Sequence, residues 1–244
     1  MTAELHVVLV RPKEDGNVGA IARVARNFGA SSLTLVAPRA GLGPEARRRA
    51  MAGLALLKSA RVARSLVEAT DGMDLVVGST DTSTGRSNAY LRRSVSPERL
   101  GEMLRPVVGR IAIVLGPEDN GLSRTELASC DLLVHVPARR EFPTLNVSHA
   151  AGLILYGLHR ASAVPDPLST PAPDVLELNG REKELLLTRL DEIAQSTGYP
   201  AHKRRGLVLL FRRLLGRSVP TEAELRMLLG FFRGIHRGYR KHHG

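Results

Sequence analysis

The 244-residue sequence contains a single cysteine, no tryptophan and few aromatic residues of any kind. Because a disulfide joins two thiols, the lone Cys130 excludes an internal disulfide and a metal site made of cysteines alone. We interpret Cys130 as a small apolar core residue in a reducing compartment, with a catalytic thiol as the alternative. Since aromatic residues make up only 4% of the chain, a platform that stacks several nucleic-acid bases is not expected.

The sequence also has no run of the roughly 20 apolar residues that a membrane-spanning helix needs. The first residues, Thr2 to His6, have neither the basic nor the apolar region of a signal peptide. We therefore expect a cytoplasmic protein that does not associate with membranes.

Acidic residues are in the minority, because 24 Asp and Glu stand against 35 Lys and Arg and give a net charge of +11. The excess is concentrated near the end of the chain, where residues 175–244 hold 14 Lys and Arg but 7 Asp and Glu. A basic segment attached to a nearly balanced domain favours binding of a polyanion, and we expect a nucleic acid. Enhanced solubility, or an arginine-rich proteome, is the alternative, and charge alone does not separate RNA from DNA.

Short apolar runs alternate with amphipathic segments through the first two-thirds of the chain. The predicted buried strands cover residues 4–10, 33–36, 75–78, 111–115 and 132–136. The predicted helices cover residues 17–28, 47–57, 64–69, 97–104 and 145–162. Strands that alternate with helices indicate an α/β fold, in which a parallel sheet is covered by helices on both faces.

The composition changes after the last of these helices. Residues 164–173 include four prolines, which exclude both a helix and a central strand, so we interpret the segment as a linker. Beyond it, apolar periodicity predicts helices over 181–197, 202–215 and 221–240, the last with the capping-box pair Thr221 and Glu224. The expected organisation is an α/β domain over 1–162, a proline-rich linker over 163–174 and a basic all-α extension over 175–244.

Two loops are the candidates for a ligand site. Residues 116–121 follow the predicted strand 111–115, and residues 137–144 follow the strand 132–136. In an open α/β sheet, ligands bind beyond the carboxyl ends of the strands, where such loops meet. The first loop lacks the GxGxxG pattern of dinucleotide folds and the closing Gly-Lys-Ser/Thr of a P-loop. A nucleotide-dependent oxidoreductase or NTPase is therefore a disfavoured alternative.

Three clusters of polar residues accompany these loops, and each has an ordinary interpretation. Asn17 fits the cap of a predicted helix, and Arg23 fits a surface arginine as well as a phosphate clamp. Glu118 fits a solvated loop residue. Thr144 and Asn146 belong to residue types that simply favour the start of a helix.

Taken together, the three clusters resemble the SPOUT superfamily of RNA methyltransferases, in its TrmH-like branch that methylates ribose 2'-hydroxyls, and most closely its TrmJ type. The matching signatures are N-x-G-x-x-x-R, at Asn17, Gly19 and Arg23; L-G-x-E-x-x-G-L, at Leu115, Gly116, Glu118, Gly121 and Leu122; and S/T-L-N-x-S, at Thr144, Leu145, Asn146 and Ser148. The match covers roughly residues 4–162, and the basic C-terminal segment resembles the helical extension of the TrmJ type.

The resemblance implies a homodimer whose sheet ends in a C-terminal trefoil knot, with S-adenosyl-L-methionine as cofactor and no metal. The cofactor positions that it implies are Ser79, Thr80, Leu115, Gly116, Glu118, Val136, Pro137, Thr144 and Leu145. The catalytic positions that it implies are Arg23, Asn17, Glu118, Thr144 and Asn146. In this family a serine is more frequent at the position of Thr144.

The implied reaction is attack of a ribose 2'-hydroxyl on a sulfonium methyl group, and the family assigns activation of that hydroxyl to the arginine matching Arg23. A free guanidinium stays protonated above about pH 12. We therefore expect Arg23 first to hold the target phosphate and stabilise the developing alkoxide, and only second to remove the proton. Asn17 and Glu118 are expected to position Arg23, while Thr144 and Asn146 hydrogen-bond the ribose or the cofactor carboxylate.

The TrmJ type implies tRNA as the partner, with methylation of cytidine or uridine at position 32 of the anticodon loop. Ribosomal RNA, position 18 of tRNA and a non-catalytic RNA-binding protein of the same fold are the alternatives. The expected RNA contacts are Arg11, Arg23, Arg47, Arg48, Arg49, Arg86, Arg92, Arg93, Arg139, Arg140, Lys203, Arg204 and Arg205.

Overall fold

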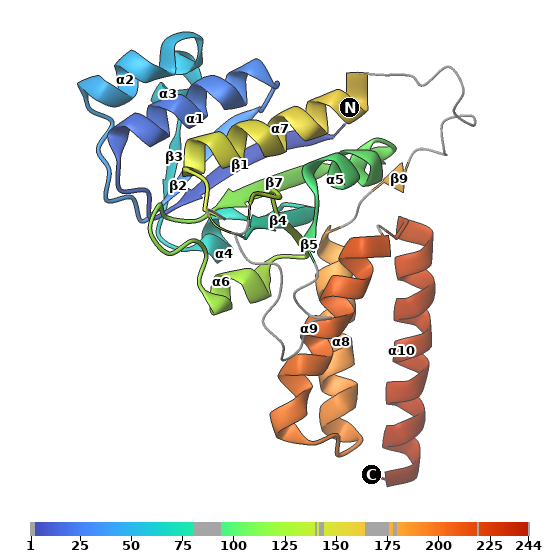
Figure 1. Cartoon of the computed structure of the whole chain (residues 1–244). Helices are drawn as coiled ribbons and strands as arrows, with labels where there is room; N and C mark the ends of the chain where they lie inside the picture. The colour runs from blue at the N-terminus through green and yellow to red at the C-terminus, as the bar shows by residue number, and fades with distance from the viewer. Residues whose placement is uncertain are drawn as a thin grey trace.

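The computed structural model of the chain describes residues 3–80, 94–139, 141, 144–163, 176–177, 180–218 and 220–243 (Figure 1). Four predicted RNA contacts, Arg86, Arg92, Arg93 and Arg140, lie outside the described residues, as does nearly all of the predicted linker. Within the described part, no helix has the length and apolar character that crossing a membrane requires.

The strands and helices follow in alternation through the first 163 residues. The strands are β1 (Glu4–Val10), β2 (Ser32–Val36), β3 (Arg61–Ala63), β4 (Leu75–Ser79), β5 (Ser94–Val95), β6 (Val107–Val108), β7 (Arg110–Leu115), β8 (Leu132–Val134) and, later, β9 (Leu176–Glu177). The helices of this part are α1 (Asp15–Asn27), α2 (Pro44–Ala50), the 3₁₀ helix η1 (Met51–Gly53), α3 (Leu54–Lys58), α4 (Leu66–Ala69), α5 (Pro97–Leu104), α6 (Arg124–Ser129) and α7 (Val147–Ala163).

Seven strands form one sheet in the order β3-β2-β1-β7-β4-β8-β5, and every pair in it is parallel. β1 lies between β2 and β7, with Val8 opposite both Thr34 and Val114. β4 lies between β7 and β8, so the carboxyl ends of β7, β4 and β8 are neighbours at one edge. The expected parallel sheet is confirmed.

Each face of this sheet is covered by its own apolar core. One core unites alternate strand residues with the buried faces of α1, α5 and α7. The other core lies under α4 and α6 and includes Val8, Val114, Leu133 and Cys130. Figure 1 shows α1, α5 and α7 on one side of the sheet and α4 and α6 on the other. The expected coverage of both faces is therefore confirmed.

α1 is held in place by close backbone contacts with the segment α2-η1-α3. A Cβ atom on Gly19 would lie 2.1 Å from the carbonyl oxygen of Ala46, and one on Gly53 would lie 2.4 Å from that of Ala22. Only glycine fits such approaches, so Gly19 of the first signature has a packing reason of its own.

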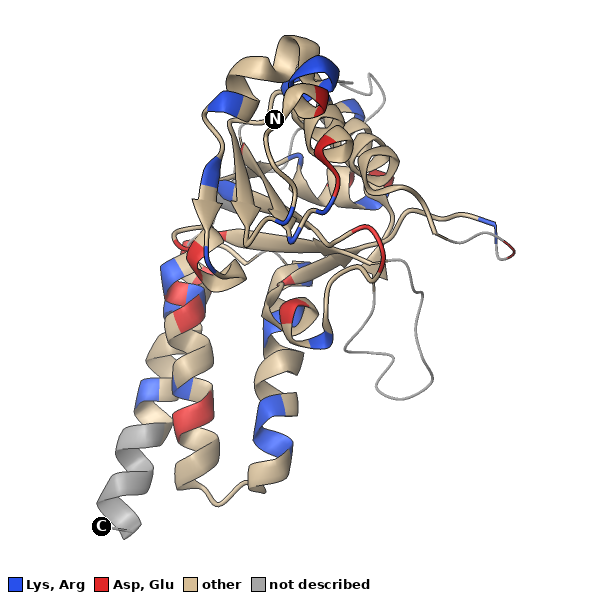
Figure 2. Ribbon diagram, turned by 90° about the vertical axis from the view of Figure 1, so that its left-hand side faces the viewer, with Lys and Arg blue, Asp and Glu red and all other residues tan. Residues whose placement is uncertain are grey.

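Three long helices follow, α8 (Gly180–Ser196), α9 (Ala201–Ser218) and α10 (Glu222–His243), as the sequence predicts. They share a small apolar core that includes Leu186, Leu190, Leu215 and Phe232. We call α8, α9 and α10 the helical unit. Figure 2 shows Lys and Arg along the helical unit, interspersed with Asp and Glu. The capping box is present, because Thr221 N–H donates to Glu224 and Glu224 N–H donates to the Thr221 hydroxyl.

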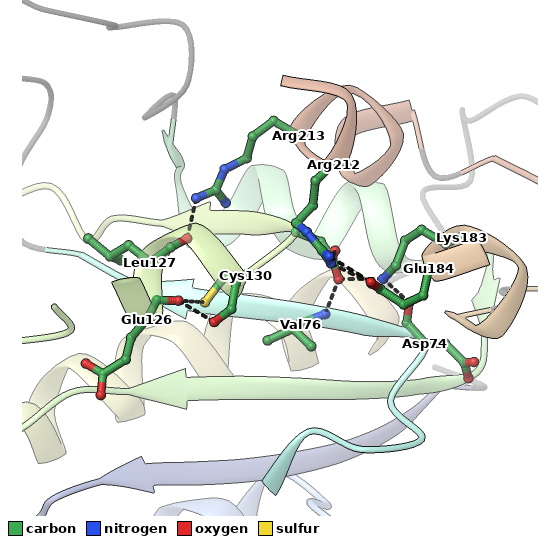
Figure 3. Close-up of polar contacts among 11 residues, drawn as sticks. Asp74, Val76, Glu126, Leu127, Cys130, Lys183, Glu184, Arg212 and Arg213 are labelled. Carbon is green, nitrogen blue, oxygen red and sulfur yellow. Dashed lines mark hydrogen bonds and ion pairs between the residues drawn. The ribbon is translucent and has the colours of Figure 1, made fainter. Parts of the chain in front are cut away.

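The helical unit docks on the α/β part through a buried ion cluster around Asp131, and Figure 3 labels its partners Lys183 and Arg212. The Asp131 side chain is fully buried, and its Oδ2 accepts from Lys183 Nζ at 2.7 Å and from the backbone of Val76 at 2.8 Å. Its Oδ1 accepts from Arg212 at 3.2 Å, and Arg212 also pairs with Glu184. In addition, β9 pairs with β6.

Candidate active site

Glu118, in the loop after β7, binds the backbone just before a helix that begins more than 100 residues earlier in the chain. Its carboxylate accepts from the backbone N–H of Lys13 at 3.0 Å and of Glu14 at 3.2 Å, at the start of α1. A negative charge is stabilised at a helix N-terminus. Burial alone would raise the pKa of Glu118, but hydrogen bonds from backbone N–H groups and from the Asn17 amide outweigh it and lower the pKa.

Asn17 lies in the first turn of α1 and is almost fully buried. Its Nδ2 donates to Glu118 Oε1 and to Glu14 Oε2, both at 3.2 Å. The prediction that Asn17 caps this helix is wrong, because α1 begins at Asp15 and Glu14 occupies its N-cap position. Asn17 instead links α1 to the loop after β7.

Asn146 caps α7 and also contacts Asn17. Its Oδ1 accepts from the backbone N–H of Ser148 at 2.8 Å and from the Ser148 hydroxyl at 2.7 Å. Its Nδ2 donates to Asn17 Oδ1 at 3.2 Å. The three signatures therefore meet in one hydrogen-bonded chain, Asn146 to Asn17 to Glu118, which we call the amide network.

The loop over residues 116–121 depends on glycine at its two ends. A Cβ atom on Gly116 would lie 2.3 Å from the carbonyl carbon of Gly121, which excludes a side chain at Gly116. Gly121 itself has a φ of +61°, a conformation that glycine adopts without the strain that other residues carry. Ser123 then caps α6 in a capping box with Glu126.

A cavity of about 640 Å³ opens between the two predicted loops. Its volume lies in the range usual for small-molecule sites. All the predicted cofactor positions except Pro137 line it, namely Ser79, Thr80, Leu115, Gly116, Glu118, Val136, Thr144 and Leu145. Pro137 is exposed and does not belong to the lining. Apolar side chains of Leu133, Val134 and Ile154 form much of the wall, so the cavity suits a flat, partly apolar group.

Arg23 lies apart from the cavity and from the amide network. Its side chain is exposed on α1, and among the described residues it has no hydrogen-bond or ion-pair partner. The structure thus brings together Asn17, Glu118 and Asn146, with Glu118 shared between the network and the cavity wall, and leaves Arg23 facing solvent. A direct contact of Asn17 or Glu118 with Arg23 is not seen.

Some of the predicted RNA contacts form ion pairs within the chain, and others do not. Arg11 pairs with both carboxylate oxygens of Glu126, with its Nη2 3.0 Å from Oε2. Arg48 and Arg49 both pair with Glu45 on their own helix, and hydrogen bonds, first from Arg48 and then from Arg49, lower the pKa of Glu45 to about 2. Of the other described positions, Arg23, Arg47, Arg139, Lys203 and Arg205 are exposed, while Arg204 is half-buried.

α9 contributes cavity residues that the sequence analysis did not assign. The cavity wall includes His202, Arg205, Gly206, Leu209 and Arg213. Of these only Arg205 was predicted to be functional, and then as an RNA contact. The available signal was the pair of arginines within the apolar run from Leu207 to Leu215, a place where a cation needs a partner.

Cys130 is a core residue, as predicted. It is fully buried under α6, and burial raises the pKa of its thiol to about 12. Such a thiol is not a nucleophile near neutral pH. The described residues also contain no group of His, Cys, Asp and Glu arranged to hold a metal ion.

Comparisons with known proteins agree with the signatures. Residues 4–156 match the model of the SpoU rRNA methylase family. The tRNA (cytidine-2'-O-)-methyltransferase TrmJ of Methanocaldococcus jannaschii is 32% identical over 96% of this chain and 100% of its own length. The crystal structure of TrmJ from Z. mobilis ZM4 superposes with a TM-score of 0.71, at 29% identity over 96% of this chain and 100% of that one.

A more distant relative of known structure was crystallised with a cofactor. The SpoU methyltransferase AviRb from Streptomyces viridochromogenes, in complex with the cofactor AdoMet, has a TM-score of 0.51 and 22% identity, over 66% of this chain and 58% of that one. This likeness shows the fold alone. The family model covers more than half of the chain and the archaeal relative covers nearly all of it, so the chain belongs to the SpoU rRNA methylase family, on its TrmJ branch.

Proposed function

We propose that this chain uses S-adenosylmethionine to methylate a ribose 2'-hydroxyl of tRNA, at position 32 of the anticodon loop. The observation that carries the proposal is the amide network, which joins the three signatures of the family beside a cavity of about 640 Å³. The M. jannaschii relative, a tRNA (cytidine-2'-O-)-methyltransferase that matches over its full length, supports tRNA as the substrate.

The residues of the cavity fit S-adenosylmethionine. Leu115, Leu133 and Val136 offer an apolar slot for the adenine ring, and the turns at Gly116 and Leu145 offer backbone groups for its polar edge. When bound, the cofactor supplies an electrophilic methyl group on a sulfonium. The AdoMet complex of AviRb, which has the same fold, supports this choice of cofactor.

The protein's own groups prepare the nucleophile. Arg23 binds the phosphate of the target nucleotide and stabilises the alkoxide that develops on the 2'-oxygen, with proton removal by Arg23 as its second role. Glu118 and Asn17 fix the start of α1, and hence the placement of the helix that carries Arg23. Thr144, at the cavity wall, and Asn146, at the start of α7, orient the ribose.

We further propose that the enzyme acts as a homodimer through the exposed side of α7 and α1. Leu153 and Tyr156 are 46% and 50% exposed on α7, and the ring of Tyr156 lies against Phe28 at the end of α1. Asn146 begins the same stripe of α7 at helical spacing. A second copy that covered this stripe would bring its own Arg23 close to the amide network, which explains why Arg23 faces solvent in the single chain.

Two further structural parts of the proposal are the knot, which the family implies, and the domain organisation, which the composition of the sequence predicts. The sheet closes with a C-terminal trefoil knot, and the chain divides into a methyltransferase domain over 1–162, a linker over 163–174 and a basic domain over 175–244. The helical unit, with exposed Lys203 and Arg205, contributes to the tRNA-binding surface. Arg11, Arg47 and Arg139 extend that surface over the α/β part.

The decisive experiment is incubation of the purified protein with unmodified tRNA transcripts and labelled S-adenosylmethionine, followed by nuclease digestion and mass mapping of methylated nucleosides. We expect one 2'-O-methyl nucleoside, at position 32. A transcript with a 2'-deoxynucleotide at that position is the matched control and should take up no label.

The other outcomes separate the parts of the proposal. Label at a different ribose would keep the reaction and overturn the position, and label on ribosomal RNA alone would overturn the tRNA assignment. Absence of transfer from a protein that binds the cofactor and tRNA would indicate a non-catalytic RNA-binding protein.

A further inference from the structure

Arg213 is a buried cation that has few partners within the chain. Its side chain lies on α9, and only 3% of the residue is exposed. Nη2 donates to the backbone carbonyl oxygen of Leu127 at 2.5 Å (Figure 3). Its Nε and Nη1 are buried and have no hydrogen-bond partner among the residues that the structure describes. Buried guanidinium groups are normally satisfied, so two nitrogen atoms with three unpaired N–H donors indicate a missing ligand.

The acidic group that acts electrostatically on Arg213, Asp131 of the ion cluster, is already occupied by other partners. Its two oxygens accept from Lys183, Arg212 and the backbone of Val76. Cys130 supplies no negative charge, because burial keeps its thiol protonated. Burial also lowers the pKa of Arg213, as expected for a cation without a dedicated counterion. An uncompensated buried charge is costly, and an anion that entered the site would remove that cost.

The position of Arg213 indicates where this anion would bind. Arg213 belongs to the wall of the 640 Å³ cavity, together with Leu127 and Leu133. The same wall continues to Leu115 and Gly116, which we assign to the adenosine part of the cofactor. Arg213 thus lines the same cavity in which the proposed cofactor binds.

We propose that Arg213 binds the carboxylate of the methionine part of S-adenosylmethionine, and equally that of the product S-adenosylhomocysteine. This assignment rests on the proposed function, which supplies the cofactor. The carboxylate is the only anionic group of the cofactor, and planar guanidinium and carboxylate groups form paired, charge-assisted hydrogen bonds. Because α9 carries Arg213 and docks through Arg212, the helical unit becomes a part of the cofactor site.

The test compares two ligands that differ in the amino-acid part. S-adenosylhomocysteine carries the carboxylate, whereas 5'-methylthioadenosine keeps adenosine and the thioether and lacks it. Affinities are measured by titration calorimetry on the full-length protein and on Arg213→Met. The Arg213→Met exchange should lower the affinity for S-adenosylhomocysteine about 10- to 100-fold, as loss of a charged hydrogen-bonded pair predicts. The affinity for 5'-methylthioadenosine should stay unchanged.

Arg217→Met is the matched control, because it removes the same charge one turn further along α9 from a residue outside the cavity wall. It should leave both affinities unchanged. Arg213→Lys, which keeps a positive charge, should recover part of the lost affinity.

Three results would overturn the assignment. An equal loss of affinity for both ligands in Arg213→Met would show that Arg213 only supports the structure of the cavity wall. Unchanged affinity for S-adenosylhomocysteine with weakened tRNA binding would identify an RNA phosphate as its anion. Failure of the wild-type protein to bind S-adenosylhomocysteine at all would overturn the proposed function first, before any variant is compared.

Discussion

The Nδ2 of Asn146 donates to the Oδ1 of Asn17 at 3.2 Å, although 129 residues separate the two in the sequence. Each amide is also engaged at its other end, Asn146 by Ser148 and Asn17 by Glu118. The start of α7, the first turn of α1 and the loop after β7 are therefore fixed relative to one another by a few side chains.

The two asparagines should be energetically coupled. We expect Asn17→Ala to cost about 1–3 kcal/mol in the free energy of unfolding, since it leaves buried partners unsatisfied. Asn146→Ala should cost about 0.5–2 kcal/mol through the lost cap of α7. The double variant should cost less than the two together by about 0.5 kcal/mol or more, measured by urea denaturation. Ser96→Ala, at the cap of α5, is the control that should add independently to Asn17→Ala. Additive losses at Asn17 and Asn146 would contradict the network.

Glu118→Gln should destabilise the protein in a pH-dependent way. Because the pKa of folded Glu118 lies below its ordinary value, the ionised carboxylate stabilises the fold above the unfolded pKa of about 4.3. That contribution is lost as the pH falls through the lower folded pKa. The stability gap between wild type and Glu118→Gln should therefore be widest near about pH 7 and close in acid. Denaturation at several pH values tests this, with the exposed Glu102→Gln as control, and a constant gap would show that the charge of Glu118 is immaterial.

Arg23→Ala should abolish methyl transfer and spare cofactor binding, because Arg23 lies outside the cavity wall. Loss of a group that stabilises developing charge predicts a fall in kcat of about 100-fold or more. Single-turnover assays on tRNA give the rate, and calorimetry with S-adenosylhomocysteine gives the affinity. Arg26→Ala, also exposed on α1, should keep most of the rate. Normal turnover in Arg23→Ala would remove Arg23 from the mechanism.

Asp131→Ala should weaken the docking of the helical unit severely. It leaves Lys183 and Arg212 with an incomplete set of partners in a buried site, which predicts a loss of about 3–5 kcal/mol. Asp119→Ala breaks an exposed pair with Lys13 and should change stability little. Thermal denaturation of both variants provides the comparison. Similar melting temperatures for the two would mean that the buried cluster contributes no more than a surface pair.

Gly19→Ala should destabilise the fold, because its new methyl group would meet the backbone of Ala46 at 2.1 Å. Overpacking of this kind costs about 1–3 kcal/mol. The matched control is Gly230→Ala on α10, where no atom lies within 4 Å and the gain in helix propensity predicts about 0.5–1 kcal/mol of added stability. In chemical denaturation, we expect the two variants to change the free energy of unfolding in opposite directions. A neutral Gly19→Ala would show that α2 moves freely on α1.

Local patterns in the sequence were sufficient for the elements with strong periodicity. The strand over 4–10 and the helix over 97–104 have the predicted bounds, because one is a continuous apolar run and the other begins with a serine cap and a proline. β3 and β5 were missed since two or three residues carry no period. They form because their backbones pair with the edge of a neighbouring strand, β2 for β3 and β8 for β5.

The candidate site was predictable in its residue types and less so in its contacts. The two candidate loops follow from their places at strand ends, a rule that needs no coordinates, whereas the individual cofactor positions follow from the family resemblance. The bond from Asn17 to Glu118 and the entry of Arg213 into the cavity wall depend on elements that pack far from their sequence neighbours. Helical periodicity shows that α9 is amphipathic, and it does not show which surface its buried face covers.

The wall that α9 adds to the cavity is the last of its walls to be synthesised. A ribosome makes Ser79, Leu115 and Leu145 well before it makes Arg213. An emerging chain can assemble the parallel sheet and the amide network while the cavity is still open on the side of α9. A chain whose translation stops between α7 and α9 therefore carries every signature of the family and lacks the part of the cavity wall that α9 supplies.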